Sequence, residues 1–285
     1  MPRRDQTAVR KARCWLGELP LASTDIERHL QRLLALRAAE VIRPLPRRKI
    51  ASLFTRLSDS LPPFNIVEYY GDPVLAIAAQ GILLDQGIQH ADLMALVSLY
   101  ANALADDHRP EPELALVACL LRRCGFKVTS PEIPAKRAIS SAAQLLAADR
   151  KQTLEICRLV TTLTACGTRF VDIGDIGALL PSLCLSYATD WDAEAVSCLL
   201  RTCAYIGKSK EPACQWALEW LLDQQGINGR FGLFAPEAGR MQHDVNDWHL
   251  YFYPTVGALW CLAEIHQPGF LLSDHGPQSS GRTCL

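Results

Sequence analysis

The sequence has no excess of charge of either sign. Its 29 Lys and Arg residues stand against 30 Asp and Glu residues, which leaves a formal net charge of −1. A balanced chain has no overall field to attract nucleic acid or an anionic membrane surface. Basic residues cluster only locally, at 3–13 and 43–49, and short clusters of this kind are more often solvated faces than binding sites. We therefore expect no nucleic-acid partner.

Long hydrophobic runs are also missing. A membrane-spanning helix needs about 20 consecutive apolar residues, and no run approaches that length, so no integral membrane segment is expected. Residues 1–20 are charged and lack the apolar stretch of a secretory signal. The 11 cysteines form no Cys-x-x-Cys pair, and most lie inside apolar helical patterns. An odd number of cysteines in such places predicts reduced, buried thiols in a cytoplasmic protein.

Sustained period-two alternation, the pattern of a half-buried strand, is absent as well. Apolar residues recur instead at helical spacing, which predicts an all-α fold. Apolar helices are predicted to begin near residues 72, 112, 152, 192 and 254, with an earlier member at 29–41 and more mixed helices between them. The first three intervals are about 40 residues long, the length of a helical-hairpin repeat.

Direct self-similarity supports these repeats. Residues 117–124 read VACLLRRC and residues 196–203 read VSCLLRTC, which are identical at six of eight positions and lie two periods apart. In such repeats each helix pair buries its apolar face against its neighbours. We predict a single domain over residues 1–267, with an N-terminal helix and linker at 1–22, and a flexible tail at 268–285.

About six helix pairs would close into a ring, an (α/α) toroid. An open solenoid of the HEAT type is the alternative. An open array would need a polar cap at each end, and the predicted last helix, 254–265, is too apolar to serve as one. The toroid is therefore the favoured fold.

The loop 225–232, QGINGRFG, follows a helix that contains Trp220. Gly229 and Gly232 permit a positive φ, the Gln225 amide can bond the loop backbone, and Phe231 can pack between neighbouring helix pairs. The segment resembles the Q-W repeat of squalene–hopene cyclases and the related protein prenyltransferase β-subunits. That repeat is structural in the family, so the resemblance implies the toroid fold rather than an activity.

The segment 190–195, DWDAEA, lies one hairpin before this loop and resembles the Asp-x-Asp-Asp-Thr-Ala motif of class II terpene cyclases. In that family the middle Asp protonates an alkene or epoxide. The resemblance implies this catalytic role for Asp192, with Asp190 as its neighbour. Ala193 and Glu194 stand where the motif has its third acid and its Thr. Read from the residues alone, either aspartate is equally well a helix N-cap.

Acid-initiated cyclisation requires an apolar, aromatic-lined cavity, because ring faces stabilise a carbocation and water destroys it. The expected substrate-binding residues are Trp191, Glu194, Trp248, His249, Tyr253 and Trp260. The segment 243–249 is rich in metal-ligand residue types, but the Asp-x-Cys pair of the prenyltransferase zinc site does not follow the loop. We expect no metal site and no cofactor, with Mg²⁺ only as the companion of a diphosphate substrate.

Two functions follow from this sequence. The first is a terpene cyclase-like isomerase or lyase that acts on an isoprenoid or other apolar substrate in a central cavity. The second is a non-catalytic toroid that binds a peptide, a lipid or a protein partner in a biosynthetic pathway, and Ala193 favours it. A single ring also resembles a prenyltransferase subunit, which needs a helical partner subunit.

Overall fold

A computed structural model describes residues 4–22, 25–63, 71–105, 112–129, 141–232 and 248–272. Within these ranges the chain forms 12 helices and no β-strand, which confirms the all-α prediction. The helices are α1 (Arg4–Glu18), α2 (Ile26–Ile42), α3 (Arg47–Asp59), α4 (Pro73–Asp85), α5 (Ala91–Ala105), α6 (Pro112–Arg123), α7 (Ala142–Leu146), α8 (Arg150–Leu163), α9 (Ile176–Thr189), α10 (Ala193–Tyr205), α11 (Pro212–Asp223) and α12 (His249–His266).

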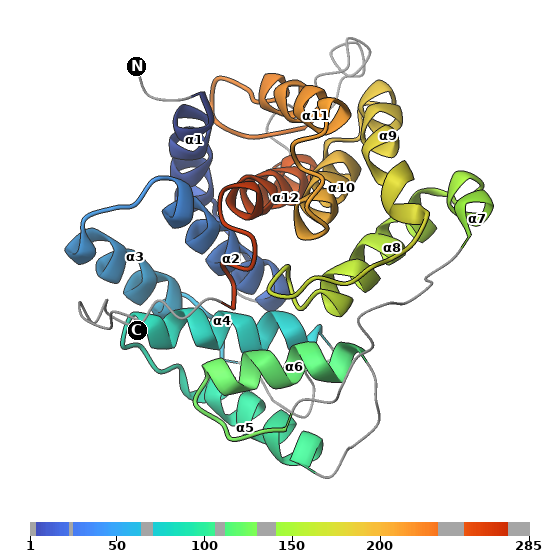
Figure 1. Cartoon of the computed structure of the whole chain (residues 1–285). Helices are drawn as coiled ribbons and strands as arrows, with labels where there is room; N and C mark the ends of the chain where they lie inside the picture. Colours follow the sequence, from blue (N-terminus) through green and yellow to red (C-terminus); the bar gives the residue numbers. More distant parts are fainter. Residues whose placement is uncertain are drawn as a thin grey trace, which may run out of the picture.

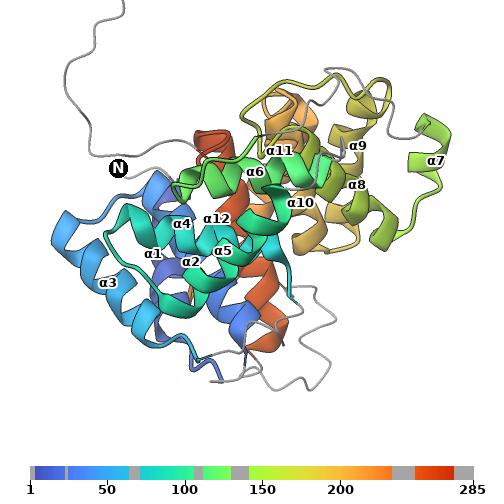
Figure 2. The same cartoon turned by 90° about the horizontal axis from the view of Figure 1, so that it is seen from below.

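The even-numbered helices contact one another in a closed order. α2 packs on α4, α4 on α6, α6 on α8, α8 on α10 and α10 on α12, and α12 returns to α2. We call these six the inner helices and the odd-numbered ones the outer helices. Figure 1 shows the inner helices nearer the centre of the view and the outer helices around its edge. Seen from below in Figure 2, α3 and α7 lie at opposite ends of the molecule.

The inner helix α4 is apolar because α2, α5 and α6 pack against it on several sides. In α4 every residue from Leu75 to Leu83 is buried, as expected of a helix without a solvent face. Its start is set by Asp72, whose carboxylate accepts a hydrogen bond from Val74 N at 2.9 Å, followed by Pro73 in the first turn. The apolar helix predicted to begin near residue 72 therefore occurs.

Two predicted boundaries differ from the structure. The last inner helix begins at His249, five residues before the predicted start at Pro254. The prediction placed Pro254 in the first turn, where proline is favoured, but it lies inside the helix. Of the mixed helix expected before residue 152, the structure describes only the short α7, because residues 130–140 lie outside the described ranges. Phe270 and Leu271, assigned to the expected tail, are buried in the core.

None of the described helices is both long enough and apolar enough to span a membrane.

Candidate functional site

The loop that follows α11 joins the two ends of the chain. The Gln225 side-chain amide donates to the carbonyl oxygen of Gly229 at 2.9 Å and to that of Ala8 in α1 at 2.8 Å. The backbone N–H of Phe231, a fully buried residue, donates to the hydroxyl of Thr255 in α12 at 2.9 Å. The predicted bond from Gln225 to its own loop is confirmed, and the loop connects α11 with α1 and α12.

The acidic segment 190–194 lies at the start of α10. Asp192 is the N-cap residue, and its carboxylate accepts a hydrogen bond from Ala195 N at 3.0 Å. The Arg150 guanidinium pairs with Asp192 and also donates to Glu194 at 2.7 Å. Asp190 is exposed at the C-terminal end of α9. Of the two aspartates, Asp192 is therefore the helix N-cap.

The ion pair between Arg150 and Asp192 affects whether Asp192 can act as a general acid. Hydrogen bonding to Asp192 raises the pKa of the Arg150 guanidinium, which stays cationic. A carboxylate that pairs with a cation serves as an anion, whereas protonation of an alkene requires a neutral carboxylic acid. As it stands in the structure, Asp192 caps and anchors a helix.

We expect Asp192→Ala to lower the free energy of unfolding by about 1–2 kcal/mol, because it removes both the cap and a half-exposed ion pair. Asp192→Asn keeps a capping side chain and should lose less than about 1 kcal/mol. Urea denaturation measures both. If Asp192→Asn abolished ligand binding while stability stayed unchanged, the aspartate would have a direct role in the site instead.

The main cavity lies between α4, α5, α6 and α8, with α10 and α12 at its inner end, and has a volume of about 510 Å³. A second, inner hollow of about 210 Å³ lies among α2, α4, α10 and α12. The two share Asp72, Val74, Cys198, Arg201 and Trp260 in their linings. The shared residues make the two hollows neighbours. Together we call them the central cavity.

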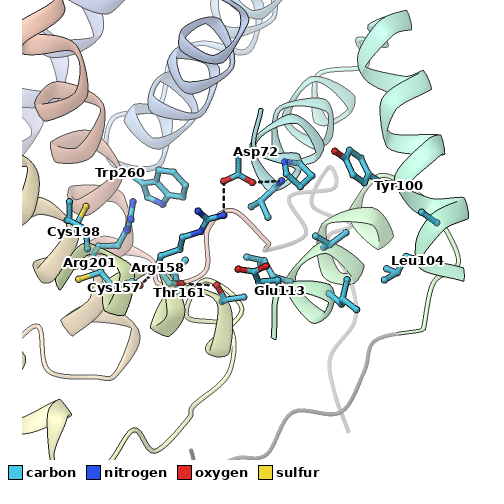
Figure 3. A pocket seen from close by; sticks show the side chains of 18 residues that line it. Asp72, Tyr100, Leu104, Glu113, Cys157, Arg158, Thr161, Cys198, Arg201 and Trp260 are labelled. Carbon is cyan, nitrogen blue, oxygen red and sulfur yellow. Dashed lines mark hydrogen bonds and ion pairs between the residues drawn. The ribbon is translucent and has the colours of Figure 1, made fainter. Parts of the chain in front are cut away.

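Arg201 of α10 stands where the two hollows meet. Its guanidinium carbon lies 4.4 Å from the centre of the Trp260 ring, a cation–π contact. Its Nε is buried without a hydrogen-bond partner, and no salt bridge reaches the guanidinium within the described residues. Figure 3 shows Arg201 beside Cys157 and Cys198 on one side of the cavity, with Trp260 above it. An unpaired cation beside a cavity is a candidate anion-binding group.

A second arginine lies at the outer part of the cavity. Arg158 of α8 points across it toward Asp72, with 3.7 Å between the guanidinium nitrogen and the carboxylate oxygen. The Arg158 side chain is 65% exposed, so the pair lies in solvent and contributes little to stability. This part of the cavity therefore carries an exposed pair of charges beside a lining that is mainly apolar.

A buried carboxyl group lies behind the Trp260 ring. Glu264 is fully buried and accepts hydrogen bonds from Tyr205 Oη at 2.9 Å, Trp260 Nε1 at 3.1 Å and Gly269 N at 2.7 Å. Burial raises the pKa of Glu264 to about 7. The three hydrogen bonds favour the carboxylate and act in the opposite direction, but the effect of burial is larger. Glu264 therefore fixes the orientation of the tryptophan on which Arg201 rests.

The expected site residues divide into two groups. Glu194, Tyr253 and Trp260 line the central cavity. Trp191 is partly exposed and makes an edge contact with Trp220, with ring centres 6.2 Å apart.

The remaining aromatic candidates, Trp248 and His249, stack on each other at the start of α12, with ring centres 3.7 Å apart, and are not among the residues that line the central cavity. Residues 243–247 of the segment considered for zinc lie outside the described ranges.

Two charged residues at this site were not predicted: Arg201, which lines the cavity, and Glu264, which lies behind Trp260. Each is a single charge inside an apolar helical run, Leu199–Ala204 and Ala258–Ile265. A charge on the buried side of such a helix needs a partner or a ligand. A single charged residue in an apolar helical run can therefore be used to predict a binding site or a buried polar network from the sequence.

No family model matches the chain, and no curated protein and no solved structure is significantly similar to it.

Proposed function

We propose that the protein is an (α/α) toroid of six helical hairpins whose central cavity binds a ligand with an apolar body and an anionic group. The closed order of contacts among the inner helices supports the ring. The loop 225–232, which bonds both α1 and α12, supports the same arrangement and the resemblance to toroid enzymes of isoprenoid metabolism.

The dimensions of the cavity fit an extended organic molecule. Small-molecule sites usually enclose about 300–1,000 Å³ and are mainly apolar, and the main cavity has about 510 Å³. The inner hollow adds a narrower extension beyond Arg201 and Trp260. An isoprenoid or acyl chain would bury its apolar length against such a lining, where each buried methylene contributes about 0.8 kcal/mol.

The observation that carries the proposal is the unpaired Arg201 guanidinium. The Nε of Arg201 is buried without an acceptor, which is unfavourable. A carboxylate or phosphate of the ligand would supply the missing acceptor in a bidentate geometry. Trp260 holds the guanidinium in place by the cation–π contact. Arg201 would thus select anionic ligands over neutral ones of the same length.

Binding is better supported than catalysis. Asp192 is occupied by its cap and ion pair. The second candidate function, acid-initiated cyclisation of an isoprenoid, is favoured by one observation, the presence of Glu194 in the lining of the inner hollow. In that function Glu194 rather than Asp192 would be the acid, and it would first have to separate from Arg150.

The test compares matched pairs of ligands that differ only in the charged group, farnesyl diphosphate with farnesol and palmitate with hexadecanol. Binding is followed by calorimetry and by the fluorescence change of the tryptophans, among them Trp260. We expect the anionic member of at least one pair to bind at least tenfold more tightly than its neutral counterpart, and Arg201→Met to remove this preference. Arg10→Met, the same change at an exposed position of α1, is the control.

Equal binding of charged and neutral members, or no binding of either pair, would contradict the proposal. Products extracted from the same incubations with wild-type protein and with Glu194→Gln decide the second candidate. A cyclised product that disappears in the variant would make the protein an enzyme.

A further inference from the structure

Three cysteines meet between α9, α10 and α11, away from the central cavity. Cys184, Cys203 and Cys214 come from one helix each, and their sulfur atoms all lie within 4.8 Å of one another. All three side chains are buried, with at most 1% of their surface exposed. The three helices pack on one another, α9 on α10 and α11 and α10 on α11, as Figure 1 shows at the top of the view.

We infer that Cys184, Cys203 and Cys214 form a binding site for one thiophilic metal ion, Zn²⁺ or Cu⁺. Thiolates that share an ion at the usual metal–sulfur distance of about 2.3 Å are separated by about 4 Å. The observed separations differ from this by less than about 1 Å, which side-chain rotation can supply. Thiolate sulfur is also the ligand that selects these two ions from the other common metals.

One of the three positions, Cys214, favours the anionic form that metal binding requires, whereas hydrogen bonding within the cluster and burial raise the pKa of Cys203, so a bound ion would have to displace its proton. Cys214 lies in the first turn of α11, where the free backbone N–H groups and the helix dipole stabilise a thiolate. Another buried thiol, Cys261 of α12, interacts electrostatically with both Cys184 and Cys214. Its sulfur is not part of the group that lies within 4.8 Å. The three sulfurs alone can hold Cu⁺, whereas Zn²⁺ would need a fourth ligand.

The cluster has no role in the proposed ligand site. None of its three residues lines the central cavity. An ion bound there would join two outer helices, α9 and α11, to the inner helix between them. Its function would be to stabilise this side of the molecule, and metal supply would then control how much folded protein exists.

The experiment uses the full chain, reduced and treated with a chelator. Zn²⁺ is added in competition with a chromogenic chelator in one series, and Cu⁺ in competition with a Cu⁺-specific chelator in a second. We expect one ion per chain in at least one series and a rise in Tm of at least about 5 °C on loading. The series that reaches one equivalent identifies the ion.

Each of Cys184→Ala, Cys203→Ala and Cys214→Ala should weaken binding at least tenfold. Cys124→Ala, which removes a buried thiol directly after α6 that is not part of the cluster, should leave binding unchanged. X-ray absorption of the loaded wild-type protein is independent of whether the variants fold, and it should show a shell of sulfur neighbours at about 2.3 Å.

Three results would overturn the inference. The first is the absence of a stoichiometric ion in both series. The second is a first shell of nitrogen and oxygen atoms. The third is a disulfide between two of the three cysteines in protein prepared without reductant, detected by mass, that persists when the ion is offered.

Discussion

Replacing Gly229 by alanine should lower the free energy of unfolding by more than about 3 kcal/mol. Gly229 has a φ of +95°, a conformation that residues with a side chain rarely adopt. A Cβ atom at this position would lie 2.3 Å from the carbonyl oxygen and 2.4 Å from the carbonyl carbon of Lys11 in α1. These are backbone atoms of a packed helix, so the overlap can be relieved only if α1 moves away from the loop.

Gly207→Ala is the matched control for this prediction. Gly207 also has a positive φ, +75°, but a Cβ atom there meets nothing within 4 Å, so only the backbone term of about 1 kcal/mol remains. Urea denaturation of the wild type and the two variants measures the difference. Equal losses for the two glycines would show that α1 does not press against the loop.

The second large effect is a dependence of stability on pH that arises from Glu264. Burial raises its pKa from 4.5 to about 7. Between these two values the folded protein binds a proton that the unfolded chain has released, so the free energy of unfolding falls as the pH rises. The contribution is fully present below about pH 4.5 and is lost as the pH passes through about 7. The total change is of the order of 3 kcal/mol.

Glu264→Gln tests this because the amide does not titrate. We expect the stability of the wild type to decrease from pH 5 to pH 8 more steeply than that of the variant, as measured by urea denaturation at each pH. Glu18→Gln, at an exposed position of α1, should follow the wild-type curve. Parallel curves for the wild type and Glu264→Gln would show that the carboxyl group is already ionised at pH 5.

The helices were predictable because burial on several sides leaves a direct record in sequence. A run such as Leu75–Leu83 has no polar face to expose, and only a helix enclosed by others can accommodate it. Local capping signals are equally readable, as Asp72 with Pro73 demonstrates. These features depend on residues close to one another in the chain.

The site was less predictable because it is assembled from distant parts of the chain. The sequence of segment 190–194 is compatible both with an Asp192 that protonates a substrate and with an Asp192 that caps a helix. The residue that distinguishes the two roles is its ion-pair partner Arg150, which is 42 residues away in the chain. Cys184, Cys203 and Cys214 have no metal-site spacing, since each belongs to a different helix. The inward direction of Arg201 likewise depends on the packing of α10 against α12.

The bonds of Gln225 have a consequence for how the molecule folds. Its bond to Ala8 spans 217 residues, and the His266–Asp5 contact spans 261. Neighbouring hairpins can associate over short stretches of chain, but these contacts require almost the whole polypeptide to be in place. The contacts that α1 makes with α12 and with the loop after α11 should therefore form late in folding and break early in unfolding. Their formation would complete folding, and their loss would begin unfolding.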